Sequence, residues 1–261
     1  GSFRWFNDKE SEGRFTVEYA NTESDLLAAI SDDTDIVYIE TPTNPLMVEF
    51  DIATVAKAAH DKGAKLIVDN TFYSPIYQNP IPLGADIVVH SATKYLAGHN
   101  DVLAGIVVTN DQAIYDKLFY NLNTTGSTLS PFDSYLLMRG LKTLKLRMEK
   151  ATENARELVT FLKTLPTVKE VLYTGKGGMI SFKVADESKI PTIINRLEVI
   201  TFAESLGGVE SLITYPRTQT HADIPEDVRL SYGLTNDLLR LSIGIEDVDD
   251  LKQDLKAALG A

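Results

Sequence analysis

The segment from residue 65 to residue 105 reads KLIVDNTFYSPIYQNPIPLGADIVVHSATKYLAGHNDVLAG. It contains two short apolar runs, at residues 66–68 (LIV) and 87–89 (IVV), and polar residues follow each run. Runs of this length that end in polar residues are typical of buried parallel strands. The segment therefore predicts an α/β fold in which neighbouring strands deliver polar side chains to one edge of a sheet.

Two side chains at this edge have the chemistry of a cofactor pocket. Asp69 follows the first run, and Lys94 follows the second, with Ser91 and Thr93 just before it. Ligands of open α/β sheets bind at the carboxyl ends of the strands. A lysine there could form a Schiff base with an aldehyde cofactor, and an aspartate could hold a protonated ring nitrogen. Taken alone, Lys94 would be a surface lysine after a strand and Asp69 a turn-capping aspartate.

The preceding residues extend the pattern. A strand predicted at residues 35–39 leads into ETPTNP at 40–45, where two prolines force an irregular turn. Asp51 then caps a helix that Gly63 ends. Strand, helix and strand in this order form a βαβ unit with parallel neighbours.

The second half of the chain predicts a different architecture. A helical tract at residues 132–165, interrupted at Gly140, is expected to bridge two domains, at residues 1–143 and 144–261. The first would be the α/β cofactor domain and the second a smaller α+β domain. Its elements are expected at residues 168–173, 179–184 and 239–243 (strands) and at 190–197 and 248–259 (helices).

Composition excludes several function classes. The 261 residues are 44% hydrophobic and 24% charged, and no apolar run approaches the roughly 20 residues of a membrane span. The net charge of −12 argues against nucleic acid or an anionic membrane as a partner. Without cysteine there are no disulfides or thiol nucleophiles, which fits a cytoplasmic location without requiring one. The histidines show no metal-ligand spacing, so no metal is expected.

The run DNTFYSP, then Q-x-P, then GADIVVHSATKYLAGHNDVLAG resembles the pyridoxal-phosphate enzymes of cysteine and methionine metabolism. This family contains the cystathionine synthases and lyases and the methionine γ-lyases, and the resemblance extends from Arg4 to the C-terminus. It implies a fold-type-I PLP-dependent transferase-like architecture, with a mostly parallel cofactor domain and a smaller α+β domain. It also implies pyridoxal 5'-phosphate as cofactor and a homotetramer of dimers that share active sites.

The resemblance assigns roles to the residues of the edge. It implies that Lys94 holds the cofactor covalently and then moves protons, for which burial must lower its usual pKa of about 10.4. Asp69 would pair with the pyridinium nitrogen, and Ser91 and Thr93 would supply hydroxyls to the phosphate. Without the resemblance, both hydroxyls would be ordinary turn chemistry.

The turn at residues 40–45 and two C-terminal positions complete the implied site. Asn44 would lie near the phenolic oxygen of the cofactor, the alternative being a turn residue that bonds its own backbone. Glu40 would belong to the same polar shell. Arg240, between two leucines, would bind the substrate α-carboxylate through a bidentate pair. Ser205 would lie close to the lysine and this carboxylate, as a catalytic and substrate-binding residue.

Glu204 and Arg4 favour a substrate with two charged ends. In the resembled cystathionine γ-synthases and γ-lyases, a glutamate faces the distal part of the substrate, where methionine γ-lyases carry an apolar residue. Glu204 could then meet the ammonium of cystathionine, and Arg4 its distal carboxylate. The alternative for Arg4 is a surface cation resting on aromatic residues.

The sequence departs from the family pattern in two places. The front of the cofactor domain is absent, with its Ser-Gly-Met-type phosphate turn, its stacking aromatic residue and the Tyr-x-Arg residues lent by a neighbouring subunit. The joint at residues 173–179 is also shorter than in relatives. One hypothesis covers both: these residues are the ordered part of a longer protein. An intact mass near 28.8 kDa would rule it out.

The sequence therefore predicts a PLP-dependent carbon–sulfur lyase that cleaves the C–S bond of cystathionine or a related amino acid. The alternative within enzymes is a cystathionine γ-synthase, which performs γ-replacement on an O-acylhomoserine. A hypothesis of another class is a non-catalytic truncated homologue. The residues do not separate β-cleavage, γ-cleavage and γ-replacement.

Overall fold

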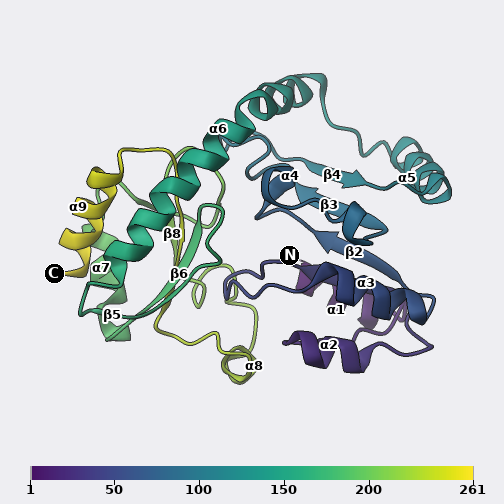
Figure 1. Ribbon diagram of the computed structural model, residues 1–261, viewed down its shortest axis with the longest axis horizontal. Coiled ribbons are helices and arrows are strands. Elements are labelled where there is room, and N and C mark those ends of the chain that lie inside the picture. The colour runs from purple at the N-terminus through teal and green to yellow at the C-terminus, as the bar shows by residue number, and fades with distance from the viewer. Residues whose placement is uncertain (1, 261) are drawn as a thin grey trace.

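The computed structural model describes residues 2–260, and their strands form two sheets. The first sheet has the order β1-β2-β3-β4 and the second the order β5-β6-β9-β8-β7. Figure 1 shows the two sheets on opposite sides of the molecule, with α6 extending from one to the other. The strands are β1 (Ile36–Glu40), β2 (Lys65–Asp69), β3 (Ile87–Ser91), β4 (Gly105–Val108), β5 (Val168–Leu172), β6 (Met179–Val184), β7 (Thr201–Phe202), β8 (Leu212–Thr214) and β9 (Leu238–Ser242).

The four-stranded sheet has the predicted α/β topology. Strands β1, β2 and β3 are parallel, and β4 lies antiparallel to β3. Helix α3 (Ile52–Asp61) connects β1 to β2, and its apolar side packs on one face of the sheet. The Asp51 carboxylate accepts hydrogen bonds from the amides of Ala53 and Thr54, as the predicted cap requires. The expected βαβ unit is therefore present.

The opposite face of this sheet is only partly covered. The side chains on that face alternate with the buried ones, and those of Tyr38, Ile67 and Val89 are partly exposed. Helix α1 (Ser2–Ser11), which the sequence did not predict, reaches this face, where the rings of Phe6 and Tyr38 have centroids 5.5 Å apart. The polar residues that end the strands are reached from this face.

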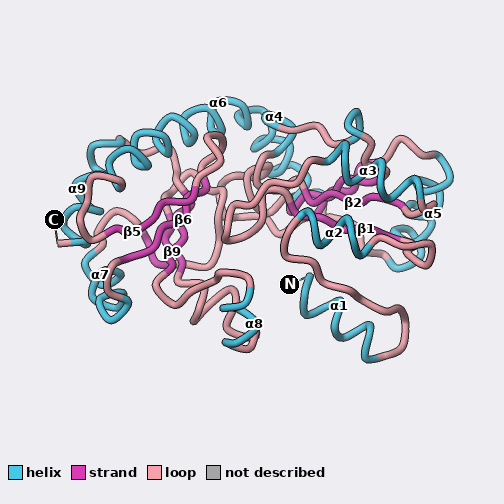
Figure 2. The backbone as a smooth tube through the Cα atoms, turned by 60° about the horizontal axis from the view of Figure 1, so that its bottom comes forward, coloured by secondary structure: helices cyan, strands magenta, loops and turns pink. Residues whose placement is uncertain are grey.

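The remaining helices lie around the two sheets, as Figure 2 shows. These helices are α2 (Glu23–Ala29), α4 (Ser74–Tyr77), α5 (Gln112–Thr125), α6 (Pro131–Leu162), α7 (Ile190–Arg196), α8 (Glu226–Ser231) and α9 (Val248–Leu259), with 3₁₀ turns at Ile81–Leu83 and Glu187–Lys189. Helices α4, α5 and α8 were not predicted from the sequence.

The expected interruption of the long helix at Gly140 is wrong. Helix α6 runs without a break for 32 residues from a Ser130 cap. Gly140 is buried, and a Cβ built there would lie 2.2 Å from the carbonyl oxygen of Ala97. Gly140 therefore does not end a helix. Its missing side chain allows α6 to pack closely against the segment after Lys94.

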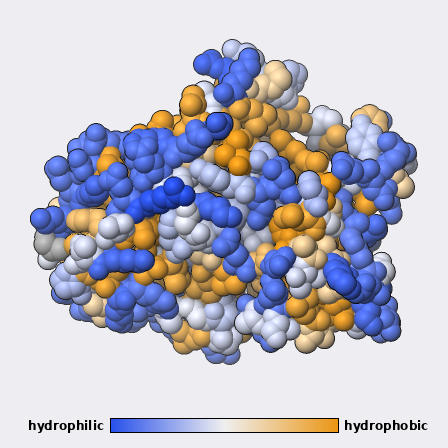
Figure 3. All heavy atoms as spheres, in the orientation of Figure 1, coloured by the Kyte–Doolittle hydropathy of each residue, from blue (hydrophilic) through white to orange (hydrophobic). Residues whose placement is uncertain are grey.

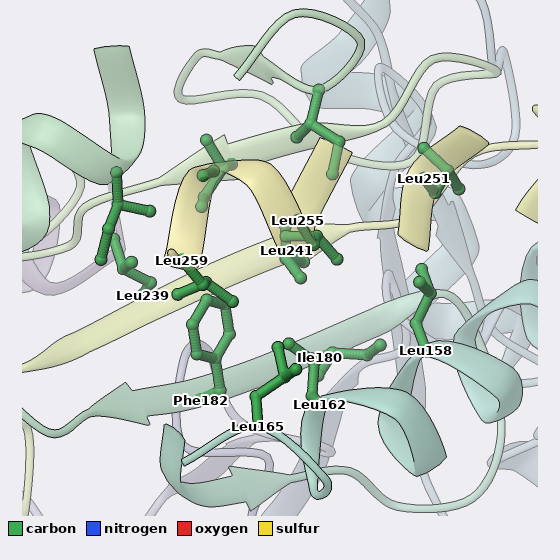
Figure 4. Packing of buried hydrophobic residues seen from close by; sticks show 14 of the residues in the cluster. Leu158, Leu162, Leu165, Ile180, Phe182, Leu239, Leu241, Leu251, Leu255 and Leu259 are labelled. Atoms are coloured by element: carbon green, nitrogen blue, oxygen red, sulfur yellow. The ribbon is translucent and has the colours of Figure 1, made fainter. Parts of the chain in front are cut away.

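The five-stranded sheet has a fully enclosed core. All five residues of β9 are buried, and α6, α7 and α9 contribute apolar side chains on one side. Figure 4 shows how Phe182 and Leu239 lie with Leu158, Leu162 and Leu259 in this cluster. The sheet is antiparallel except for the β7–β8 pair, consistent with the predicted α+β unit.

The predicted domain boundary between residues 143 and 144 falls inside α6. The first part of α6 contributes Leu137 and Leu144 to one hydrophobic cluster, and its second part contributes Leu158 and Leu162 to another. The division into domains stays a prediction. Among residues 2–260, no helix is long and apolar enough to span a membrane.

Candidate functional site

The ends of the parallel strands bring three predicted residues together. Strand β1 ends at Glu40, β2 at Asp69 and β3 at Ser91. The strand register places Glu40 beside Asp69 and Asp69 beside Val89. Because parallel strands end at the same edge, these polar groups share one rim.

Lys94 lies in the turn that follows β3. Its amide donates to the carbonyl oxygen of Ser91 at 3.1 Å, and its own carbonyl oxygen accepts from the amide of Gly98 at 2.8 Å. The side chain is partly buried, and its Nζ lies 3.4 Å from Ser205 Oγ. Burial, and next the charge of Arg240, lower the pKa of the Lys94 ammonium. Lys94 therefore loses its proton more readily than a surface lysine, as a nucleophilic amine requires.

Arg147 of α6 holds the backbone of this turn. Its guanidinium is buried and donates to the carbonyl oxygens of Tyr95 at 2.8 Å, Leu96 at 3.4 Å and Gly140 at 2.9 Å. Arg147 was not predicted from the sequence, because nothing in the helical periodicity separates it from an exposed arginine. It fixes the two residues after Lys94 and so limits the positions that the lysine can take.

Arg240 occupies the middle of β9, with a side chain only 1% exposed. Its Nη1 donates to Asn44 Oδ1 at 2.9 Å. Its Nη2 lies within hydrogen-bonding distance of Thr214 Oγ1 (2.9 Å) and of the carbonyl oxygens of Glu204 (2.9 Å) and Ser205 (3.2 Å). Burial lowers the pKa of Arg240 to about 10. The side chain thus joins the turn after β1 to the segment that carries Ser205.

The charge of Arg240 has no ion-pair partner in the described part of the chain. No carboxylate of residues 2–260 lies within 4.0 Å of its guanidinium, and its buried Nε has no hydrogen-bond partner. A buried cation without an anion is costly. A carboxylate brought by a ligand would supply the missing charge, as expected for a substrate-binding arginine.

The two acidic residues of the rim differ in their surroundings. Asp69 Oδ1 accepts from the amide of Thr71 at 3.0 Å, and Oδ2 accepts from the Tyr38 hydroxyl at 3.2 Å. Glu40 Oε2 accepts from the amide of Asn44 at 3.3 Å. Burial, and next the neighbouring charge of Asp69, raise the pKa of Glu40 to about 8. Glu40 therefore loses its proton less readily than an exposed glutamate while it supports the turn that carries Asn44.

The hydroxyl groups near Lys94 are arranged less simply than expected. Thr93 Oγ1 donates to the carbonyl oxygen of Ala104 at 3.2 Å and accepts from the amide of the same residue at 3.0 Å. Its one proton is engaged by the backbone, so donation to a phosphate requires the hydroxyl to rotate. Ser91, the last residue of β3, uses its amide to donate to Thr71 Oγ1 at 2.8 Å.

Ser205 reaches the lysine because its segment passes very close to the Lys94 turn. Gly207 has a φ of +75°, and a Cβ there would lie 2.7 Å from the amide nitrogen of Tyr95. Glycine is therefore required for this approach. Ser205 Oγ also lies 3.4 Å from Asn100 Oδ1, and the side chain of Glu204 is exposed to solvent.

Arg4 is placed on α1, where it forms an ion pair with Asp223 at 3.1 Å. Both side chains are mostly exposed, 71% and 65% respectively. The structure thus gives Arg4 an acidic partner that the sequence analysis did not foresee. His221, on the same segment as Asp223, was also missed, and burial and the charge of Arg240 lower its pKa to about 4.

Tyr38 is the missed residue for which the sequence held a signal. It stands two positions before Glu40 in a predicted strand, and alternate residues of a strand share a face. That periodicity would have placed it on the face of Glu40 and Asp69. Thr214, beside Arg240, gave no such signal because β8 was not predicted.

The residues of the rim fit pyridoxal phosphate. A partly buried amine with a lowered pKa, a carboxylate at a strand end and a buried guanidinium without a counter-ion are the groups that such a cofactor and an amino-acid substrate need. The arrangement can form an imine at Lys94, hold a cationic ring nitrogen at Asp69 and bind a carboxylate at Arg240. These are groups that a PLP-dependent enzyme requires.

Comparison with known proteins identifies the family. The family described as Cys/Met metabolism PLP-dependent enzyme matches residues 1–260. The chain belongs to this family, which confirms the predicted family, the α/β fold class, the PLP cofactor and enzymatic action on sulfur amino acids.

The relatives carry several activities. The chain is 52% identical to a cystathionine gamma-synthase/O-acetylhomoserine (thiol)-lyase of Bacillus subtilis, over 99% of this chain and 70% of the relative. It is 53% identical to a cystathionine gamma-synthase of Haemophilus influenzae, over 92% of this chain and 66% of the relative. A solved cystathionine gamma synthase of Xanthomonas oryzae pv. oryzae in complex with cystathionine is 40% identical with a TM-score of 0.95, covering 99% of this chain and 72% of that one. The chain thus spans about two thirds of the length of its relatives.

Proposed function

We propose that this chain carries the PLP site of an enzyme that cleaves the C–S bond of cystathionine or a related sulfur amino acid. The observation that carries this proposal is the position of the Lys94 amine. Its Nζ lies 3.4 Å from Ser205 Oγ, and the charge of the buried Arg240 helps to lower its pKa. When bound, pyridoxal phosphate supplies an aldehyde carbon for amines and a cationic ring that stores electron density. The site roles of Lys94, Asp69, Ser91, Thr93, Asn44 and Glu40 are part of this proposal.

The protein groups divide the work as follows. Asp69 keeps a proton on the ring nitrogen, since an ionised carboxylate favours the cationic partner. Arg240 holds the substrate α-carboxylate, which orients the α-carbon toward Lys94. Lys94 Nζ takes the α-proton and returns protons to the product side. Ser205, beside Nζ, keeps the amine positioned between these steps.

The distal end of the substrate would meet Glu204 and Arg4. Glu204 is exposed next to Ser205, which suits contact with an ammonium. Arg4 would release Asp223 and then contact the distal carboxylate of the substrate. Because Glu204 and Arg4 together match an ammonium and a carboxylate, they favour cystathionine, which carries both groups at each end, as the substrate.

The alternative reaction is γ-replacement, as in a cystathionine γ-synthase. Two relatives with 52% and 53% identity carry synthase names, whereas relatives named cystathionine gamma-lyase and beta-lyase have 47% and 44%. The rim residues serve both reactions, so identity alone does not favour cleavage. The proposal also includes a homotetramer of dimers that share active sites, and a cytoplasmic location. The family resemblance supports both. Light scattering tests the homotetramer.

The test is incubation of the chain with L-cystathionine, with and without added pyridoxal phosphate. We expect release of a 2-oxo acid and a thiol, with pyruvate marking β-cleavage and 2-oxobutyrate marking γ-cleavage. Formation of cystathionine from an O-acylhomoserine and cysteine, without 2-oxo acid, would favour the synthase. Borohydride reduction should fix the cofactor on the peptide that contains Lys94, and a Lys94→Ala variant is the control. If borohydride fixes no cofactor on the chain and the chain does not convert cystathionine, the remaining hypothesis is a non-catalytic homologue.

A further inference from the structure

The hydroxyl of Tyr38 contacts the acid of the rim. Tyr38 lies in β1 two residues before Glu40, and the register pairs it with Ile67 and pairs Glu40 with Asp69. Because alternate residues of parallel strands share a face, Tyr38 and Asp69 lie on the same side of the sheet. The phenol extends along the strand direction and donates to Asp69 Oδ2 at 3.2 Å.

The Asp69 carboxylate is thereby held at both oxygens. Oδ1 accepts from the amide of Thr71 on its own turn, and Oδ2 accepts from Tyr38 on the neighbouring strand. An ionised carboxylate has about four acceptor positions, so two contacts leave room for a ring N–H. Donors from two different elements restrict rotation of the carboxylate better than one donor can.

Tyr38 is itself restrained. Its side chain is partly buried, and the ring of Phe6 packs against it at 5.5 Å with an interplanar angle of 74°. Burial, and next the negative charge of Asp69, raise the pKa of the phenol above its ordinary value. The hydroxyl therefore keeps its proton, and so remains a donor, more readily than that of an exposed tyrosine.

We propose that Tyr38 is a positioning residue that orients Asp69 toward the ring nitrogen of the cofactor. The inference rests on the proposed function, because it assumes that Asp69 meets that nitrogen. Tyr38 acts through Asp69, so its contribution should exist only when the cofactor has a ring nitrogen to bind. The dependence of its effect on the ring nitrogen distinguishes Tyr38 from a residue that merely supports the fold.

The experiment compares two cofactors on the full chain. Dissociation constants are measured by equilibrium dialysis for pyridoxal phosphate and for its 1-deaza analogue, in which a CH replaces the ring nitrogen. Tyr38→Phe removes only the hydroxyl. Since the lost hydrogen bond is to a charged group, we expect about 10-fold weaker binding of pyridoxal phosphate. Binding of the deaza analogue should change less than about 2-fold, because Asp69 then has no ring N–H to accept.

Tyr77→Phe is the matched control. Its hydroxyl also makes internal hydrogen bonds, with Thr152 Oγ1 at 2.8 Å and the carbonyl oxygen of Met148 at 3.3 Å. It should leave the ratio of the two dissociation constants unchanged. Equal losses for both cofactors in Tyr38→Phe, or no loss for either, would overturn the inference and leave the proposed function intact. A wild-type chain that binds neither cofactor would overturn both.

Discussion

The two sheets of this protein differ in how completely they are covered. In the five-stranded sheet every residue of β9 is buried, and helices α6, α7 and α9 enclose its core. In the four-stranded sheet only alternate residues of β1, β2 and β3 are buried, because α3 covers one face and the other is largely open. The open face is the one that carries Tyr38, Glu40 and Asp69. The acidic residues of the rim therefore lie on the less covered sheet, whereas Arg240, which completes the site, lies in the middle of the enclosed one.

Exposed apolar side chains follow the same division. Several of them lie on α5, β4 and the N-terminal part of α6, where Figure 3 shows hydrophobic surface beside α6. The most exposed are Leu103, Phe132, Tyr120 and Leu146. Patches of this kind mark surfaces that other chain segments or partners cover. Around the five-stranded sheet the exposed apolar side chains are fewer, and they include Val199 and Phe202.

The largest expected effect comes from making the same substitution in both sheets. Ile180→Ala removes a fully buried side chain of β6 and should lower the free energy of unfolding by about 2–5 kcal/mol. Ile67→Ala, on the partly exposed face of β2, should cost about 1 kcal/mol or less. Urea unfolding measures both. Equal losses would show that the four-stranded sheet is as tightly packed as the other.

The second prediction concerns the contact between α6 and the Lys94 turn. In most helices Gly→Ala is stabilising by about 1 kcal/mol. In Gly140→Ala the added methyl would overlap the carbonyl oxygen of Ala97, so we expect a net loss of about 1–3 kcal/mol. Thermal unfolding, with Thr160→Ala at an exposed position of α6 as the control, checks it. A stabilised Gly140→Ala variant would mean that α6 and the turn can separate without cost.

The smallest effect is a pH dependence at the rim. The pKa of Glu40 is about 8 in the folded chain and near 4.5 without the fold, so the folded state binds the proton more tightly. Stability from this group is full below pH 4.5 and is lost as pH rises toward 8. Glu40→Gln should therefore gain stability over the wild type by about 1 kcal/mol between pH 5 and pH 8.5, less than the full pKa shift implies, because the side chain is partly exposed and solvent screens it.

Urea unfolding of the cofactor-free protein at the two pH values measures this difference. Glu153→Gln, whose side chain on α6 is 62% exposed, is the matched control. A Glu40→Gln variant that tracks the wild type at both pH values would show that water reaches Glu40 freely and that the open face is wetter than its neighbours indicate.

Local sequence patterns predicted the elements that surround the site. The apolar runs at residues 66–68 and 87–89 are the cores of β2 and β3, and the Asp51 cap and the βαβ unit are present. Helices α1 and α5 were missed; neither buries a residue, although α5 carries an apolar stripe at helical spacing that the sequence displays, at Tyr115, Leu118, Phe119 and Leu122. The interruption at Gly140 was wrong because single-residue propensity cannot reveal a backbone contact with residue 97.

The site itself was predicted unevenly. Strand periodicity and the family motifs led to Asp69, Lys94 and Arg240, since each follows or occupies a recognisable strand. Their partners Tyr38, Thr214 and Arg147 were missed because those contacts join elements far apart in the chain.

The sequence alone indicated that β1, β2 and β3 run parallel and which residue types stand at their ends, because period and caps are local properties, and its family motifs indicated the cofactor. Only the tertiary structure decided which groups meet: that Arg240 is buried without an anion, that Arg147 holds the Lys94 turn and that Tyr38 bonds Asp69. The physical reason is that hydrogen bonding and desolvation depend on distances between segments that no local pattern encodes.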